Sequence, residues 1–167
     1  MKNIGVFYGS ITGNTQEVAE AIRSEFGKSA IVQDINEVDR VDLQDYDLVI
    51  LGTSTWEVGE REEWKEFLAK LDNPERYDTK FALFGLGDQK EYPEKFLNTM
   101  GFLYDRLLAR GATIIGKFPT DGFGFTASDA ISNGHFVGLA LDQDNQPEQS
   151  PVRIRNWVAQ IRRSMAE

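Results

Sequence analysis

The sequence predicts a doubly wound α/β domain, in which helices cover both faces of a parallel sheet. Five short runs, mostly apolar, supply the strands, at residues 4–8, 30–32, 47–52, 81–86 and 112–116. Strands that are apolar without alternation are typical of parallel sheets buried on both faces. Helical patterns lie between these runs, and alternating strands and helices indicate parallel connections. The 167 residues correspond to one domain spanning 1–167.

The helical patterns are recognised by apolar residues that recur every three to four positions. The first helix is expected from about Thr15 to Phe26, and Gly27 is placed to end it. Three further stripes cover residues 64–71, 96–108 and 154–161, and Gly111 follows the second of these. Each stripe can pack one helix face onto the sheet.

A polar loop bounded by glycines joins the first strand to the first helix, and its residues are Gly9, Ser10, Ile11, Thr12, Gly13, Asn14 and Thr15. Backbone N–H groups and the helix N-terminus favour an anion here, and the side chains add neutral donors. The two glycines are expected to permit positive φ and close backbone approach. The loop lacks Lys and Arg, and its glycine spacing excludes a Walker loop and a dinucleotide fingerprint. Neutral donors suit a single terminal phosphate, and a ligand-free helix cap is the alternative.

The 9–15 loop resembles the FMN-phosphate loop of flavodoxins, and two further matches follow in order at residues 53–60 and 85–92. The resemblance extends from the first strand to the C-terminal helix. It implies a flavodoxin-like sheet of order 2-1-3-4-5 with FMN at the carboxyl ends of strands 1 and 3. The first two motifs directly follow those strands, which supports this position independently of the family.

The resemblance also implies which residues bind the flavin. Trp56 and Tyr92 should sandwich the isoalloxazine ring, Asp88 should lie at its pyrimidine edge, and Asp144 should reach the ribityl chain. The full predicted set is Ser10, Ile11, Thr12, Gly13, Asn14, Thr15, Ser54, Thr55, Trp56, Glu57, Val58, Gly59, Leu86, Gly87, Asp88, Tyr92 and Asp144. The alternatives are a core tryptophan, a surface tyrosine, and a solvated loop at Asp142 and Asp144.

Two residues depart from the family pattern, and one segment is added. Ser54 stands where a proline is common, and Glu91 stands where a glycine is common. If the loop needs positive φ at Glu91, that residue is strained or the loop is reshaped. The segment 117–135, followed by a further apolar strand at 136–141, resembles the insertion that interrupts the fifth strand of long-chain flavodoxins. It either docks a partner or packs its phenylalanines on the sheet edge.

Composition limits the classes of partner. Lys plus Arg total 18 and Asp plus Glu total 27, giving a net charge of −9. This charge argues against nucleic acid and anionic membranes and favours basic partners. The absence of Cys excludes disulfides and Fe–S ligation, and a single His argues against zinc or haem. Because the N-terminus leads directly into a strand and no long apolar span is present, we expect a soluble, monomeric, cytoplasmic protein.

The resemblance implies a low-potential one-electron carrier that uses the semiquinone/hydroquinone couple of FMN, and not an enzyme. Glutamates around the second motif, namely Glu57, Glu60, Glu62, Glu63 and Glu66, should oppose the anionic hydroquinone, although Glu62 and Glu66 also fit a solvated helix face. The Glu57 carbonyl is expected to turn toward flavin N5, a movement that β-branched Val58 resists. Expected partners carry basic patches, as on a ferredoxin/flavodoxin-NADP reductase.

Two other functions fit the same fold class. One is an FMN-dependent NAD(P)H oxidoreductase, against which the chain shows no recognisable nicotinamide site. The other is a response-regulator-like domain, which needs paired carboxylates after strand 1 and a phosphorylatable Asp after strand 3. Those places hold Gly9-Ser10 and Thr53-Ser54.

Overall fold

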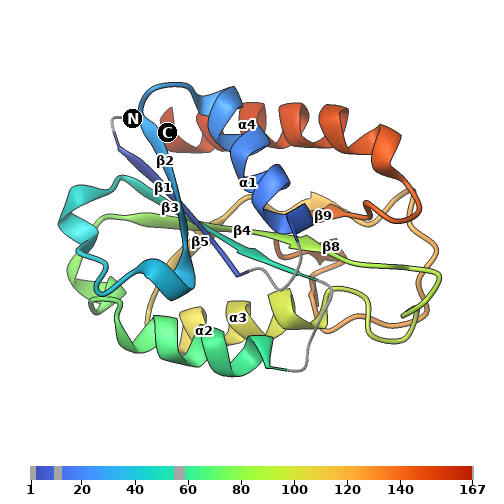
Figure 1. Cartoon of the computed structure of the whole chain (residues 1–167), viewed down its shortest axis with the longest axis horizontal. Coiled ribbons are helices and arrows are strands. Elements are labelled where there is room, and N and C mark those ends of the chain that lie inside the picture. Colours follow the sequence, from blue (N-terminus) through green and yellow to red (C-terminus); the bar gives the residue numbers. More distant parts are fainter. Residues whose placement is uncertain (1–2, 10–12, 55–58, 167) are drawn as a thin grey trace.

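The computed structural model describes residues 3–9, 13–54 and 59–166, and it has the predicted layered arrangement. A parallel sheet lies between one layer formed by α1 and α4 and another formed by α2 and α3 (Figure 1). Its strands are ordered β2-β1-β3-β4-β5, with β9 also paired to β4. The strand bounds are β1 Ile4–Tyr8, β2 Ala30–Asp34, β3 Leu48–Thr53, β4 Lys80–Leu86, β5 Thr113–Ile115 and β9 Leu139–Leu141. The predicted order 2-1-3-4-5 is confirmed.

The position of the fifth strand is shared by two segments of chain. β5 pairs with the first half of β4, where Lys80 lies opposite Thr113, and β9 pairs with the second half, where Phe84 lies opposite Leu139. Between them, β6 (Phe118–Pro119), β7 (Ile131–Ser132) and β8 (His135–Phe136) form a small antiparallel sheet of order β6-β8-β7. The predicted interruption of the fifth strand is therefore confirmed.

The prediction of one strand over 136–141 is wrong, because this run is divided between β8 and β9. Gly138 lies at the division, where an added Cβ would lie 2.2 Å from the Leu83 carbonyl oxygen. The chain can pass this close to β4 because glycine has no side chain. The apolar run thus belongs to two sheets.

Four helices occupy the predicted stripes, with small differences at their ends. They are α1 Gly13–Phe26, α2 Glu60–Ala69, α3 Asn98–Ala109 and α4 Ser150–Ala166. α1 begins two residues earlier than predicted and ends at Phe26, and Gly27 follows with a φ of 87°. Leu71 and Phe96 lie just outside α2 and α3, yet both side chains are buried in the core. The apolar spacing therefore predicted burial correctly at these two positions but not at Leu108, which is 46% exposed, and it gave the helix bounds only approximately.

Burial on both sheet faces explains the unbroken apolar strands. Every residue of β1 and β3 is buried. Each helix layer contributes a fully buried tryptophan, Trp64 from α2 and Trp157 from α4. The Trp157 Nε1–H donates to the Gly116 carbonyl oxygen at 2.8 Å, so its polar atom is satisfied. Burying each large apolar side chain contributes roughly 1.5–3 kcal/mol, and the sheet is held mainly by these contacts.

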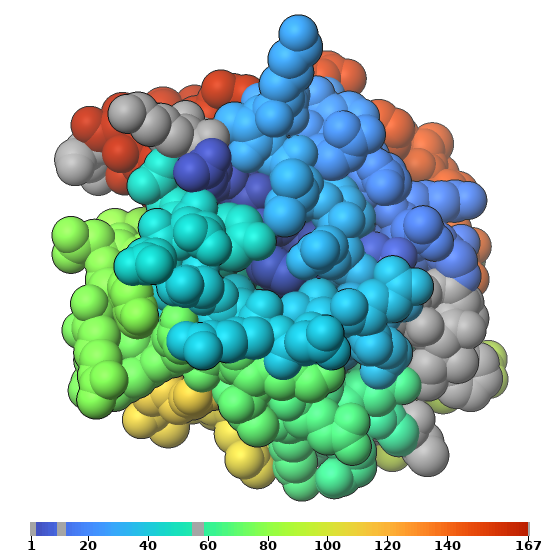
Figure 2. All heavy atoms as spheres, turned by 60° about the vertical axis from the view of Figure 1, so that its left-hand side comes forward, coloured from blue at the N-terminus to red at the C-terminus, as the bar shows by residue number. Residues whose placement is uncertain are grey.

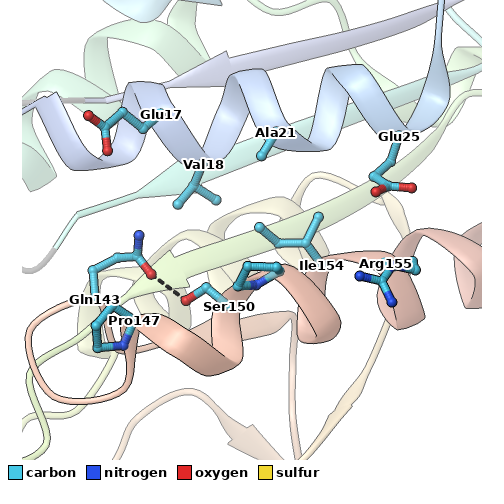
Figure 3. Close-up of a pocket in the computed structure, with 10 residues that line it drawn as sticks. Glu17, Val18, Ala21, Glu25, Gln143, Pro147, Ser150, Ile154 and Arg155 are labelled. Atoms are coloured by element: carbon cyan, nitrogen blue, oxygen red, sulfur yellow. Dashed lines mark hydrogen bonds between the residues drawn. The ribbon is translucent and has the colours of Figure 1, made fainter.

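A cavity of about 240 Å³ lies between α1 and α4. Figure 3 shows Val18 and Ile154 facing each other across it, with Glu25 and Arg155 at one end. At the other end the Ser150 hydroxyl donates to Gln143 Oε1. The cavity is therefore a gap within one helix layer.

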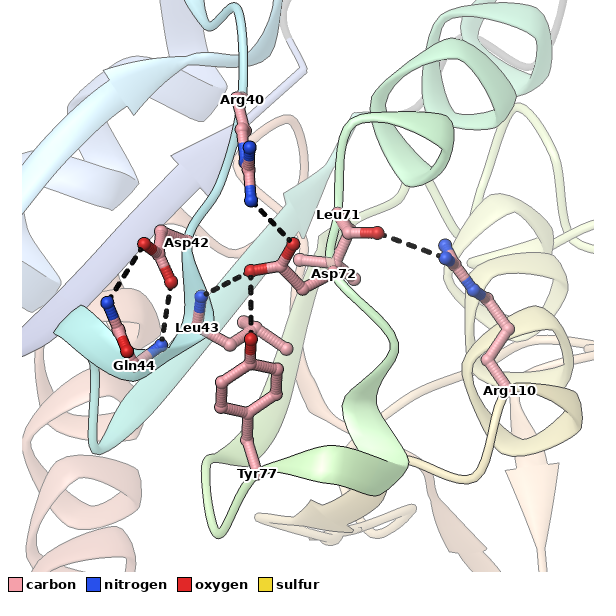
Figure 4. A network of polar contacts seen from close by, with 8 residues as sticks. All are labelled: Arg40, Asp42, Leu43, Gln44, Leu71, Asp72, Tyr77 and Arg110. Carbon is pink, nitrogen blue, oxygen red and sulfur yellow. Dashed lines mark hydrogen bonds and ion pairs between the residues drawn. The ribbon is translucent and has the colours of Figure 1, made fainter.

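A polar network holds the turns that precede β3, β4 and β5 (Figure 4). The Asp72 carboxylate accepts from the Leu43 N–H at 3.2 Å and from Arg40 at 3.4 Å. Arg110 donates to the Leu71 carbonyl oxygen at 3.1 Å. Figure 2, which brings the left-hand side of Figure 1 forward, shows the β2–β3 connection in cyan above the α2 region in green. This network stabilises the amino end of the sheet, opposite the predicted ligand loops.

Candidate functional site

The predicted binding loops meet at one edge of the sheet. β1, β3, β4 and β9 are neighbours in the parallel sheet, so the loops that follow Tyr8, Thr53, Leu86 and Leu141 leave the same edge. Among the predicted binding residues, the structure describes Gly13, Asn14, Thr15, Ser54, Gly59, Leu86, Gly87, Asp88, Tyr92 and Asp144. The others lie outside the described residues, namely Ser10, Ile11, Thr12, Thr55, Trp56, Glu57 and Val58.

The first turn of α1 places the predicted phosphate donors. Gly13 and Asn14 are exposed there, whereas Thr15 is fully buried. Within the described part of the chain, the Thr15 Oγ1 has no hydrogen-bond partner. Leaving a buried hydroxyl unpaired costs about 1–3 kcal/mol. A ligand oxygen at the helix N-terminus would supply the missing partner, so this residue fits a phosphate cradle.

The glycines of this loop act differently from the prediction. Gly9 and Gly13 both have φ values outside the positive region, so the expected use of positive φ is wrong. Space at Gly9 is tight, because an added Cβ would lie 3.1 Å from Trp64 Nε1 and 3.4 Å from Glu60 Oε1. The Gly9 backbone therefore lies close to a buried polar pair on α2.

Glu60, the first residue of α2, is fully buried and is part of a hydrogen-bonded network. Its carboxylate accepts from the Ser54 N–H at 2.7 Å, the Ser54 hydroxyl at 2.7 Å and the Trp64 Nε1–H at 3.3 Å. Burial raises the pKa of Glu60 to about 7, with a further rise from the charge of Glu63, although the three hydrogen bonds oppose the increase. The solvated-face alternative, which the sequence favours for Glu62 and Glu66, therefore does not apply to Glu60.

The neighbouring glutamates differ from Glu60. Glu62 and Glu66 are exposed, and Glu62 pairs with Lys65 at 3.0 Å, which confirms the solvated-face interpretation for these two. One carboxylate oxygen of Glu63 is buried and has no hydrogen-bond partner among the residues that the structure describes. Acidic residues in the first turn also interact favourably with the helix dipole. Among the described glutamates of this cluster, Glu60 is buried, Glu63 is partly buried, and Glu62 and Glu66 are exposed.

The third loop is organised by Asp88. Its carboxylate accepts from the Lys90 N–H at 3.2 Å, the Glu91 N–H at 2.9 Å and Asn145 Nδ2 at 2.8 Å. Burial raises the pKa of Asp88, but these hydrogen bonds outweigh it and the pKa is lowered. These hydrogen bonds to Asp88 close the turn. Glu91 does not have a positive φ, so its backbone is not strained. The left-handed residue near this loop is Leu97, with φ of 61°.

Two other predicted residues of the third loop have distinct roles in packing. An added Cβ at Gly87 would lie 2.5 Å from the Phe96 ring, so glycine is required for the backbone to pass the core. The Gly87 N–H donates to the Leu141 carbonyl oxygen at 2.9 Å, which joins this loop to β9. Leu86 is buried, whereas Tyr92 is 40% exposed. An exposed ring at this edge is available for stacking.

Asp142 connects the third loop to the loop after β9. It is fully buried and accepts from the Gln89 N–H at 3.1 Å and from Gln89 Nε2 at 2.7 Å. Asn145 Nδ2 donates to Asp142 as well, at 2.9 Å. The solvated-loop alternative is therefore wrong for Asp142. Sequence reasoning missed Gln89 and Asn145, although Asp142 could have been found because it directly follows an apolar strand.

Asp144 lies beside this network and is exposed. Partial burial raises its pKa, and the charges of Asp88 and Asp142 raise it further. Its proximity to Asp88 places it at the same edge as the other predicted residues. This position is compatible with its predicted role.

The inserted segment packs against the third loop. The Thr126 N–H donates to the Pro93 carbonyl oxygen at 2.7 Å, and the Phe96 N–H donates to the Ala127 carbonyl oxygen at 3.2 Å. The rings of Phe123 and Phe125 lie 5.5 Å from that of Phe96. The phenylalanines of the insertion therefore pack against Phe96, whereas their predicted packing on the sheet edge and partner docking both stay predictions.

None of the predicted binding residues lines the α1–α4 cavity, although its lining includes Gln143, which lies between Asp142 and Asp144 in the chain. None of the helices in the described ranges is long and apolar enough to span a membrane. The arrangement at the edge offers neutral donors at the α1 N-terminus, an exposed aromatic ring and carboxylates held by hydrogen bonds. It is suited to binding a phosphorylated aromatic group without metal chemistry being required of these residues.

Comparison with known proteins agrees with this geometry. The flavodoxin family model matches residues 6–157. The flavodoxin of Synechocystis is 42% identical over 165 residues, covering 97% of each chain. Flavodoxin 1 of Escherichia coli K12 is 43% identical over 160 residues, covering 94% of this chain and 91% of its own.

A solved structure extends the likeness to three dimensions. A mutant form of Fusobacterium nucleatum flavodoxin, crystallised with flavin mononucleotide, superimposes with a TM-score of 0.84 at 34% identity. The match covers 98% of this chain and 97% of that one. The shared strand order, the three loop motifs and the near-complete coverage lead to one assignment: the chain belongs to the flavodoxin family.

Proposed function

We infer that this chain is a one-electron carrier that binds FMN non-covalently, and that it acts as an electron-transfer protein and not as an enzyme. The observation that carries this function is the meeting of the three motif loops at one sheet edge, where Thr15 presents a buried hydroxyl without a partner in the described chain. Family membership and the FMN-bound relative support the same function. Bound FMN would supply reversible one-electron chemistry.

We propose the following division of the flavin site. The 10–15 segment holds the phosphate, with Thr15 as the buried donor, and Trp56 and Tyr92 contact the two faces of the ring. The loops at Ser54–Gly59 and Leu86–Asp88 contact the ring edge, and Asp144 reaches the ribityl chain. The phosphate would meet no cation in its loop, and hydrogen-bonded carboxylates would lie at the ring edge. Both would disfavour the negative charge that the flavin gains on full reduction, so the carrier would be strongly reducing.

We also propose the setting in which the carrier works. With a net charge of −9, it would be steered to basic patches on redox partners, such as a ferredoxin/flavodoxin-NADP reductase. It would act as a cytoplasmic monomer formed by one domain of the long-chain type. The division of the fifth strand between β5 and β9 supports the long-chain assignment.

The visible absorption spectrum of the purified chain, followed by release and identification of the chromophore, tests this function. We expect a flavin spectrum and release of FMN at close to one equivalent per chain. A chain that neither retains FMN nor binds it when FMN is added would refute the proposal. NADPH oxidation by the chain alone, without a reductase, would instead support an oxidoreductase.

A further inference from the structure

The two ends of the second loop are joined by a pair of short hydrogen bonds. Ser54 follows the last residue of β3, and Glu60 is the first residue of α2. The Ser54 N–H donates to Glu60 Oε1 at 2.7 Å, and the Ser54 hydroxyl donates to Glu60 Oε2 at 2.7 Å. Both carboxylate oxygens are used, so the geometry is bidentate. We call this pair the Ser54–Glu60 clamp.

The α2 helix and the core hold the clamp in place. The Trp64 Nε1–H donates to Glu60 Oε1 at 3.3 Å, and the Trp64 side chain is fully buried. Ser54 is 5% exposed and Glu60 is fully buried, so water does not compete for these hydrogen bonds. A buried hydrogen-bonding group left unpaired is costly, so opening the clamp is unfavourable. The distance between the end of β3 and the start of α2 is therefore rigidly set.

The residue at position 54 decides whether this clamp can form. A proline, which is common here in the family, has neither a backbone N–H nor a hydroxyl and could donate to Glu60 at neither oxygen. Serine supplies both donors from one residue. The departure from the family pattern at Ser54 is thus matched by a specific partner in this chain.

We propose that the Ser54–Glu60 clamp is a positioning device for the ring side of the flavin site. It fixes the two flanks of the second loop before the ligand arrives, and Glu60 acts through Ser54 without contacting the flavin. The inference rests on the proposed function. Fixing a binding loop in advance lowers the ordering cost of association, so the clamp contributes to affinity for the ring.

The test measures dissociation constants of FMN and of riboflavin, which lacks the phosphate, for variants of the full chain well below its unfolding temperature. Ser54→Ala removes one clamp hydrogen bond and keeps the other. Ser54→Thr restores a hydroxyl, and Glu60→Ala removes both acceptors of the clamp at a residue that does not contact the flavin. Glu62→Gln is the matched control, because it removes an exposed carboxylate from the same helical turn.

We expect Ser54→Ala and Glu60→Ala each to weaken FMN and riboflavin by the same factor, roughly three- to tenfold, and Ser54→Thr and Glu62→Gln to stay within about twofold of wild type. A loss of folding stability alone would leave these dissociation constants unchanged. Unchanged affinity in Glu60→Ala, which would assign any loss in Ser54→Ala to a direct contact, or a loss confined to FMN, would overturn the inference. A wild-type chain that binds neither flavin would overturn the proposed function as well, which separates the two failures.

Discussion

Replacing Glu60 with Gln removes the titrating group of the buried network while keeping its shape. Gln Oε1 can accept from the Ser54 N–H and Trp64 Nε1–H, and Gln Nε2 can donate to the Ser54 hydroxyl oxygen. The hydrogen bonds of the network therefore have counterparts in the variant. What changes is the response of stability to pH.

The size of this response follows from the two pKa values of Glu60. The pKa is about 7 in the folded chain and 4.5 in the reference state, so folding takes up a proton between these values. The contribution of Glu60 to stability is therefore greatest at acid pH, falls as the pH rises from about 4.5 to about 7, and is constant above that. The full change amounts to roughly 3 kcal/mol.

Urea unfolding of the flavin-free chain between pH 5 and pH 8.5 measures this change. We expect Glu60→Gln to have nearly the stability of wild type at pH 5 and to exceed it by as much as about 3 kcal/mol at pH 8. Flavin is left out because ligand binding adds its own stabilisation. The exposed Glu62→Gln variant should show no such pH-dependent difference. A Glu60→Gln difference that is equal at pH 5 and pH 8 would refute the reasoning.

Three further predictions concern the other parts of the molecule. Thr15→Ala should weaken FMN roughly tenfold while leaving riboflavin unchanged, and Thr15→Ser should restore FMN binding; equal losses for both ligands would contradict the phosphate assignment. Asp142→Ala should lower the free energy of unfolding in urea by about 2–3 kcal/mol, because it leaves the Gln89 donors unpaired, whereas the exposed Asp144→Ala should cost less than about 0.5 kcal/mol. The rate of reduction by a basic flavoprotein reductase, followed by stopped flow, should fall as salt screens attraction beyond ~8–10 Å, and a diffusion-limited rate that ignores salt would exclude electrostatic steering.

Local patterns predicted the sheet because its strands are buried on both faces and are therefore recognisable from apolar runs alone. They also placed Thr15, Ser54 and Asp88 at one edge, since loops after neighbouring parallel strands must meet there. The division at Gly138 was missed because it depends on close contact with Leu83, a residue far away in the chain. A run of apolar residues does not indicate where the chain will approach a distant strand so closely.

Buried polar networks were the main feature that the sequence did not reveal. Gln89 and Asp142 are 53 positions apart and share no motif, so their pairing arises only when β4 and β9 become neighbours. Glu60 looked like one member of an acidic helix face, and its burial depends on Trp64 and on the absence of a side chain at Gly9. Ser54 was identified as a departure, but its partner was not.

These networks also determine which carboxylates near the flavin site carry negative charge. Full reduction of a flavin adds negative charge, and two charges ~8 Å apart at an effective dielectric constant of ~20 repel by about 2 kcal/mol. Glu62 is exposed and paired with Lys65, and near pH 7 Glu60 is partly protonated, so α2 contributes less charge than its composition suggests. Asp88 has a lowered pKa and keeps its charge at the edge where β4 and β9 end. We therefore expect the resistance to full reduction to come from the third loop and the phosphate more than from the glutamates of α2.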